Sequence, residues 1–163
     1  APWSRTSIEA RRSASRRLLR VLGSNGKALW TSSEADAPEN GDPLAFSSDG
    51  ETLMVALRAE NGWTAAVKNY MGATIIDVGP VPRLQIMTLT SNGKYAMVRW
   101  LIPDQSATHT FLEVSSKTRQ DVPSSELVLG LARITEDGKV YSGKRLIFDF
   151  ALAPKKPSGP PAP

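Results

Sequence analysis

The sequence has no cysteine and only one histidine, and these shortages exclude several kinds of site. Without cysteine the chain can form no disulfide bond, thiolate nucleophile or cysteine-ligated metal site. The histidine, His109, lies in a stretch that is typical of a strand, and no Gly-x-Ser-x-Gly motif marks a nucleophile that it could activate. We therefore predict no catalytic residues, no enzymatic activity and no cofactor.

Long apolar runs are also missing. No run approaches the roughly 20 residues that a membrane-spanning helix needs, and residues 1–5 lack the apolar core of a signal peptide. A small first residue fits a chain that a signal peptidase has already cleaved, and it fits equally a chain that begins partway along a longer protein. We expect an extracytoplasmic, periplasmic location, with membrane association through partners, and the cytoplasm as the alternative.

Acidic residues are scarce at the two ends of the chain. Residues 1–27 carry seven basic residues against one acidic residue, a balance of +6, and Lys155 with Lys156 adds +2 near the other end. The net charge of all 163 residues is only +4, so the stretch between the ends is mildly acidic. The isoelectric point of 9.6 therefore describes the ends rather than a basic domain.

One turn pattern is present several times. Ser48-Asp49-Gly50 separates two apolar runs, which is typical of a β-hairpin. The same arrangement surrounds Ser91-Asn92-Gly93 and Glu136-Asp137-Gly138, and Asn25-Gly26 separates a further pair of runs. We predict tight turns at eight positions: Asn25, Gly26, Asp49, Gly50, Asn92, Gly93, Asp137 and Gly138.

The turns recur with a regular period. Those centred on Asp49, Asn92 and Asp137 are 43 and 45 residues apart. A second series of turns, near residues 25, 70 and 116, is spaced by 45 and 46 residues. Two interleaved series with one period of about 44 residues match the length of a four-stranded β-propeller blade.

The segment from Leu44 to Leu53 resembles the blade signature of TolB-like and WD40-like propellers, in which an FSPDGK segment joins the two inner strands. Ser47, Asp49 and Gly50 match this signature, and Ser48 replaces its proline. No blade ends in the Trp-Asp pair of WD40 repeats, so the TolB-like branch is the better comparison. The resemblance covers roughly residues 17–150 and implies a fold rather than an activity.

The predicted fold is all-β, with antiparallel four-stranded blades in an incomplete, about three-bladed, or assembly-completed TolB-like or WD40-like β-propeller. Residues 1–16 are predicted to be a basic arm, irregular or briefly helical, and residues 151–163 a proline-rich tail. Within 127–150, Leu127 to Ile134 is expected to be a strand. The predicted domain, residues 17–150, is divided into blade pieces 17–32, 43–78, 84–122 and 127–150.

The blade count is low, because closed propellers have about four to eight blades. If the first and last pieces join into one blade, the total is three. The chain is then a piece of a longer propeller, half of a six-bladed ring made by two copies, or an open stack whose end faces another subunit covers.

The basic arm and the tail are predicted to contact partners. Trp3 is an isolated aromatic residue in the arm and could anchor it in a pocket of another protein. An acidic protein surface or an anionic membrane surface suits the arginines, whereas nucleic acid does not, because no aromatic residues are interleaved with them. The alternative is a solvated basic arm. The candidates are Trp3, Arg5, Arg11, Arg12, Arg16, Arg17, Lys155 and Lys156.

An acidic loop supplies the only candidate metal ligands. The favoured interpretation is a solvated loop with no metal, because the order of its acids does not fit an EF-hand, and a Ca²⁺ site is the alternative. The loop should lie on the same rim as residues 60–62 and 103–105. The candidate ligands are Glu34, Asp36, Glu39 and Asp42.

These observations predict a non-enzymatic, propeller-like accessory or scaffold subunit. Its partners would be other protein subunits or a second copy, within an envelope or membrane-associated complex. One alternative is the propeller portion of a longer enzyme, such as a lactonase-like hydrolase or a peptidase. The other is a TolB-like periplasmic binding protein.

Overall fold

The computed structural model describes residues 11–13, 16–23, 25–32, 36 and 38–153, and up to residue 19 it describes the backbone alone. The described chain is all-β apart from two 3₁₀ turns, η1 (Ser124–Glu126) and η2 (Val128–Gly130). Its strands are β1 (Arg11–Ser13), β2 (Arg16–Leu22), β3 (Ala28–Ser32), β4 (Leu44–Phe46), β5 (Thr52–Ala59), β6 (Gly62–Asn69), β7 (Thr74–Val81), β8 (Arg83–Leu89), β9 (Tyr95–Leu101), β10 (Thr108–Glu113), β11 (Thr118–Pro123), β12 (Arg133–Ile134), β13 (Lys139–Ser142) and β14 (Arg145–Asp149).

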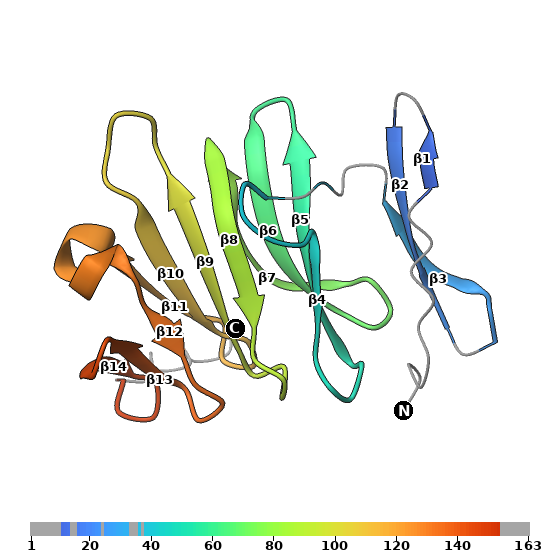
Figure 1. Cartoon of the computed structure of the whole chain (residues 1–163). Coiled ribbons are helices and arrows are strands. Elements are labelled where there is room, and N and C mark those ends of the chain that lie inside the picture. The colour runs from blue at the N-terminus through green and yellow to red at the C-terminus, as the bar shows by residue number, and fades with distance from the viewer. Residues whose placement is uncertain (1–10, 14–15, 24, 33–35, 37, 154–163) are drawn as a thin grey trace, which may run out of the picture.

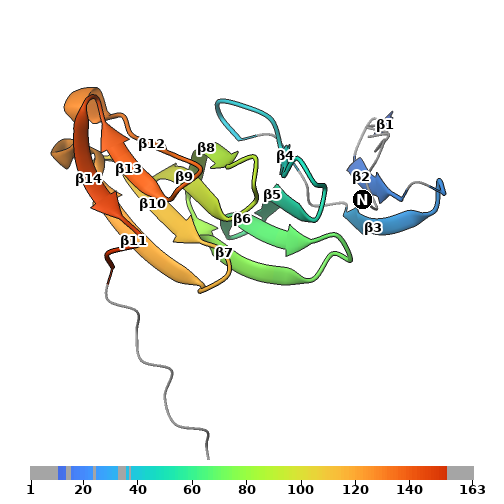
Figure 2. The ribbon, with the colours of Figure 1, turned by 90° about the horizontal axis from the view of Figure 1, so that it is seen from below.

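The strands form four antiparallel sheets that follow one another along the chain. Two are complete four-stranded meanders, β4-β5-β6-β7 and β8-β9-β10-β11, which we call the first and second full blades. A three-stranded first sheet, β1-β2-β3, precedes them, and a three-stranded last blade, β12-β13-β14, follows. Figures 1 and 2 show these sheets side by side in a row, with the first sheet and the last blade at opposite ends. The blades therefore do not close into a ring.

The repeated turn is built by its own side chains. Ser47 Oγ donates to Asp49 Oδ1 at 2.6 Å and accepts from the Thr52 amide at 2.9 Å. Thr90 with Asn92, and Thr135 with Asp137, form the same arrangement in the next two blades. Gly50 has a φ of 71°, which glycine adopts without steric cost. The predicted turns at residues 25–26, 49–50, 92–93 and 137–138 are all confirmed.

The core lies between the sheets rather than within any one of them. Met54, Val67 and Leu112 belong to a cluster between the two full blades, and Met97 and Phe111 belong to one between the second full blade and the last blade. Each fully buried side chain of this size contributes roughly 1.5–3 kcal/mol. A single blade cannot bury its own two faces, so every blade depends on its neighbours.

The expected strand from Leu127 to Ile134 is wrong over most of its length. Residues 124–130 form the two 3₁₀ turns, with Leu129 at a φ of 54°, and only Arg133–Ile134 is a strand. The buried hydroxyl of Ser142 explains the difference. It accepts from the Val128 amide at 2.6 Å and donates to the Leu131 carbonyl at 2.8 Å, so these backbone groups bond to a side chain instead of a neighbouring strand.

Three further expectations about the strands are also wrong. Residues 11–13, expected to be irregular or briefly helical, form strand β1, which pairs with β2. The first and last pieces do not join into one blade, because each is already a three-stranded sheet and a blade holds four strands. The fourth strand of the first full blade continues beyond Val78, because Val81 pairs with Trp63 after a bulge.

Candidate functional site

The last blade presents a face that the other blades bury. In each blade, the amide of the residue after the repeated turn donates to the turn hydroxyl, which aligns the second strands of the blades. Two residues further along the chain, the equivalent positions in β5, β9 and β13 are Met54, Met97 and Tyr141. Met54 and Met97 are buried because the following blade covers them. Tyr141 is only half-buried, and Figures 1 and 2 show no described sheet beyond the last blade.

The neighbouring strands repeat this contrast. The cross-strand partners of these residues on the third strands are Val67, Phe111 and Leu146. Val67 and Phe111 are fully buried, whereas Leu146 is 46% exposed. We call the surface formed by Arg133, Tyr141 and Leu146 the end face. The Arg133 guanidinium lies 4.8 Å from the Tyr141 ring centroid, and the exposed side chains of Val128, Leu129 and Leu131 belong to the segment that leads into β12.

The opposite end of the row is formed by the first sheet. Val21 and Trp30 of the first sheet pack toward the first full blade, where the Lys68 ammonium lies 5.4 Å from the Trp30 ring centroid. Their neighbours Arg20 and Thr31 pair across β2 and β3 and are exposed. Leu29, two residues before Thr31 in β3, is also 38% exposed. This end therefore presents polar and apolar side chains together, as the end face does with Arg133 beside Tyr141 and Leu146.

The side chains of the predicted basic contacts lie outside the described part of the structure. Arg11 and Arg12 belong to β1, and Arg16 and Arg17 belong to the first part of β2, where the backbone alone is described. The other candidates, Trp3, Arg5, Lys155 and Lys156, lie outside the described residues. Their contact with an acidic partner stays a prediction.

A cleft of about 250 Å³ opens at one rim of the row. The 36–42 loop, the β5–β6 turn and the β9–β10 loop lie toward the same rim, as predicted (Figure 1). Arg58 Nη1 is 3.6 Å from Asp36 Oδ2, and Arg83 Nη2 is 2.5 Å from Glu39 Oε1. We call this the rim cleft; its lining residues are Glu39, Arg58, Trp63, Arg83 and Leu84.

The candidate metal ligands of the acidic loop do not converge on one point. Asp36 and Glu39 each lie beside an arginine, Asp42 is exposed, and Glu34 lies outside the described residues. No group of three or more histidine, aspartate or glutamate side chains able to hold a metal occurs in the part of the chain that the structure describes. The arrangement suits charge pairing at a surface.

A second line of polar contacts joins neighbouring turns. The Ser48 amide donates to the Ser91 carbonyl at 2.6 Å. The Glu136 carboxylate accepts from the Ser91 amide at 2.7 Å, from Ser91 Oγ at 2.7 Å and from the Asn92 amide at 2.9 Å. The Ser91 hydroxyl, followed by the Asn92 amide, lowers the pKa of Glu136. Sequence reasoning found the turns but missed these contacts between blades. Ser48 bonds to Ser91 of the following blade, and Ser91 bonds to Glu136 of the blade after that.

His109 is buried, with 1% of its surface exposed, and its Nδ1 lies 3.2 Å from Ser124 Oγ. Burial, followed by the nearby Arg99 charge, lowers its pKa to about 4. Ser124 follows β11, and both residues belong to the second full blade and its connection to the last one. A neutral histidine enclosed in this way serves packing rather than proton transfer to a substrate.

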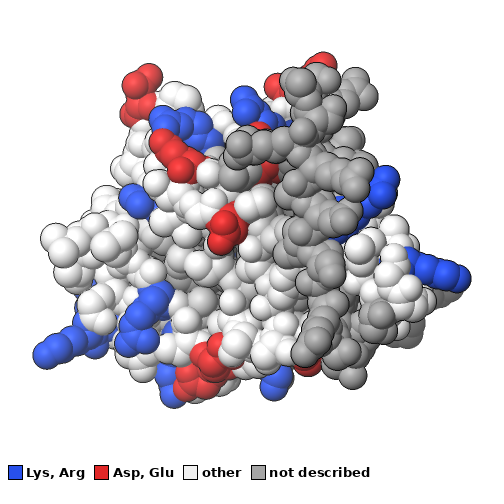
Figure 3. Space-filling model, turned by 45° about the vertical axis from the view of Figure 1, so that its right-hand side comes forward, with Lys and Arg blue, Asp and Glu red and all other residues white. Residues whose placement is uncertain are grey.

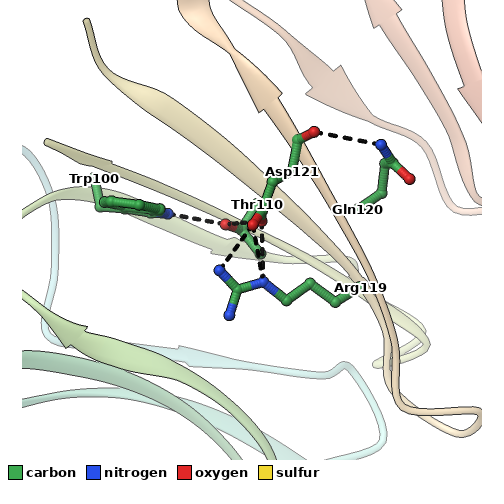
Figure 4. Close-up of polar contacts among 5 residues, drawn as sticks. All are labelled: Trp100, Thr110, Arg119, Gln120 and Asp121. Carbon is green, nitrogen blue, oxygen red and sulfur yellow. Dashed lines mark hydrogen bonds and ion pairs between the residues drawn. The ribbon is translucent and has the colours of Figure 1, made fainter. Parts of the chain in front are cut away.

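A chain of hydrogen bonds crosses three strands of the second full blade (Figure 4). Trp100 Nε1 donates to Thr110 Oγ1 at 2.9 Å, and Thr110 Oγ1 donates to Asp121 Oδ1 at 2.6 Å. Arg119 Nη2 donates to Asp121 Oδ2 at 2.9 Å. Thr110 has no exposed surface, so these contacts brace β9, β10 and β11 and present no nucleophile to solvent.

Two findings concern the chain as a whole. None of the helices among the described residues is long and apolar enough to cross a membrane. No protein-family model and no curated protein sequence matches the chain.

Solved structures do share its fold. The β-propeller domain of the Trilobed protease from Pyrococcus furiosus superposes with a TM-score of 0.53 at 8% identity, over 83% of this chain and 42% of that one. An uncharacterised protein of Listeria monocytogenes gives a TM-score of 0.54 at 11% identity, over 88% of this chain and 50% of that one. The chain thus spans half or less of the length of each. It has the blade architecture of a β-propeller, arranged as an open row.

Proposed function

We propose that this protein is a non-enzymatic, propeller-like accessory or scaffold module that docks another protein against its end face. The observation that carries the proposal is the equivalence of Met54, Met97 and Tyr141, because the first two are buried by a following blade and the third is not. The stack itself therefore specifies the missing neighbour: a β-sheet with an apolar face.

A second copy in head-to-tail order is a poorer occupant. It would have to bring the side of its first sheet that carries Arg20 against an end face that already carries Arg133. Placing two guanidinium groups in one interface costs free energy unless each charge is paired. We therefore favour a different protein, in line with the predicted accessory role, and retain the extracytoplasmic location as part of the proposal.

Photo-crosslinking tests this function. A photoreactive phenylalanine analogue at position 146 should give a defined protein adduct in cells of the source organism, whereas the same analogue at position 31 should not give that adduct. Leu146→Glu should abolish binding of the identified protein in a purified assay. The proposal is wrong if position 146 gives no adduct, or if the protein captured there binds Leu146→Glu as well as the unchanged chain.

A second candidate function is the propeller portion of a longer peptidase. It is favoured by the likeness to the propeller domain of the Trilobed protease and by the short span of that domain that this chain covers. Sequencing the complete gene tests it, because this function requires a peptidase domain in the same polypeptide.

A further inference from the structure

The rim cleft presents two guanidinium groups and an indole ring at the rim that carries the 36–42 loop. The side chains of Arg58 and Arg83 are 62% and 49% exposed. Figure 3 shows basic and acidic side chains close to one another along the upper edge of the molecule. The Arg58 Cζ lies 5.4 Å from the Trp63 ring centroid, so the indole supports one side of the guanidinium. A guanidinium held in this way can direct its edge donors to a planar anion.

The two arginines differ in how firmly the loop engages them. Arg83 Nη2 lies 2.5 Å from Glu39 Oε1, a close charge-assisted hydrogen bond. Arg58 Nη1 lies 3.6 Å from Asp36 Oδ2, which is too long for a hydrogen bond. Exposed ion pairs of this kind contribute little free energy, because water screens the two charges. A carboxylate from another molecule can therefore compete with Asp36 for Arg58.

The size and the charge of the cleft restrict the ligand. Its volume of about 250 Å³ is suited to one side chain, since pockets for drug-sized ligands hold roughly 300–1,000 Å³. The carboxylates of Asp36 and Glu39 repel a dianion such as phosphate more strongly than they repel a single carboxylate. Trp63 and Leu84 provide apolar surface for the methylene groups of the ligand.

We propose that the rim cleft binds a carboxylate carried by a peptide, with Arg58 as the main donor and Trp63 as its support. Arg83, held by Glu39, contributes positive charge, and the ligand carboxylate displaces Asp36 from Arg58. An acidic side chain and the carboxylate at a chain end share this chemistry. The site is separate from the end face and does not depend on the proposed docking function.

Nuclear magnetic resonance of the Trp63 indole N–H tests the site on the whole protein, with the resonance assigned from the spectrum of Trp63→Phe. The probes are acetyl-Ala-Glu-Ala-amide, its Gln counterpart, and acetyl-Ala-Ala-Ala with an uncapped carboxylate. We expect the Glu peptide or the uncapped peptide to shift the resonance saturably, with a dissociation constant at least about fivefold lower than that of the Gln peptide. The better of the two identifies a side chain or a chain end as the source.

Arg58→Gln should abolish the saturable shift, and its exposed position makes loss of folding improbable as an explanation if the remaining spectrum is unchanged. Arg20→Gln, which removes an exposed arginine of the first sheet that does not line the rim cleft, should leave binding unchanged. The proposal is overturned if no carboxylate peptide gives a saturable shift or if the Gln peptide binds equally well. It is also overturned if inorganic phosphate binds more tightly, or if Arg58→Gln retains the response.

Discussion

Single polar side chains fix how one blade meets the next. The Glu136 carboxylate accepts three hydrogen bonds from Ser91 and Asn92, and the Asn92 amide group donates to the Glu136 carbonyl at 2.7 Å. These contacts cross from the last blade to the second full blade. They therefore hold the end face in place relative to the rest of the row.

We expect Glu136→Gln to destabilise the fold by about 1 kcal/mol, because a neutral amide has one acceptor oxygen in place of a charged pair. The lowered pKa of Glu136 means that its contribution is present above the pKa of the unfolded carboxyl group and is lost as the pH falls through the folded value. Urea denaturation at neutral pH measures the change. Glu60→Gln, at an exposed turn, is the matched control and should have little effect.

His109 should make stability depend on pH in a mildly acidic range. The unfolded histidine binds a proton near its ordinary pKa of 6.5, whereas the folded one resists protonation down to about 4. Between these values the unfolded state holds more protons, so the free energy of unfolding falls as the pH is lowered. The loss from this group amounts to at most about 3 kcal/mol.

Urea denaturation of the unchanged protein and of His109→Gln at pH 4.5 and 7.5 isolates this term. The variant should lose less stability between the two values, because the carboxyl groups that also titrate remain in both proteins. An identical loss in the two proteins would show that burial of His109 does not govern the acid response.

At the scale of elements, equivalent strands of different blades differ in what covers them. Phe111 of β10 and Leu146 of β14 occupy the same place, yet only Phe111 is fully buried. We expect Phe111→Ala to destabilise the fold by about 3–5 kcal/mol and Leu146→Ala by less than about 1 kcal/mol. Guanidinium denaturation of both variants measures the two losses in the free energy of unfolding. Similar losses would mean that the end face is covered in solution.

Alanine substitutions at two glycines of similar conformation distinguish the cost of backbone strain from the cost of a clash between blades. Gly26 and Gly93 have φ values of 73° and 70°. A Cβ on Gly26 would meet nothing within 4 Å, whereas one on Gly93 would lie 2.9 Å from Thr52 Oγ1 in the preceding blade. Gly26→Ala should cost about 1 kcal/mol through its backbone and Gly93→Ala about 2–3 kcal/mol. Thermal unfolding of the two variants measures the difference, and equal losses would argue against close packing of the blades.

The elements that could be predicted from the sequence are those whose structure is set locally. The turns at Asp49, Asn92 and Asp137 close through side chains two to five residues apart, so their pattern is visible in the sequence and reveals the period. The strand expected from Leu127 to Ile134 does not form over most of its length, because backbone groups there bond to the side chain of Ser142, more than ten residues away.

The candidate sites depend on still longer separations. Arg83 meets Glu39 across 44 residues, and Glu136 meets Ser91 across 45. Sequence reasoning placed the acidic loop on the correct rim but could not identify the arginines beside it. It also predicted uncovered blade faces from the blade count, without showing which residues those faces would expose.

At the scale of the whole molecule, the row of blades has two different ends. The first sheet exposes Arg20, Thr31 and Leu29, whereas the last blade exposes Leu146 at a position that is buried in both full blades. Exposed apolar surface is costly in water, and at the end face it lies where a following blade covers the equivalent residues of the row. This is why we place docking at the end face.

Hydrogen–deuterium exchange of the purified protein tests the uncovered end face most directly. The hydrogen-bonded amides of β14 should exchange at least about tenfold faster than those of β6 and β10, the equivalent strands of the full blades, because uncovered elements open locally at low cost. Addition of the protein captured at position 146 should slow exchange in β14 alone. Equal protection of β6, β10 and β14 in a sample shown by light scattering to be monomeric would contradict the account.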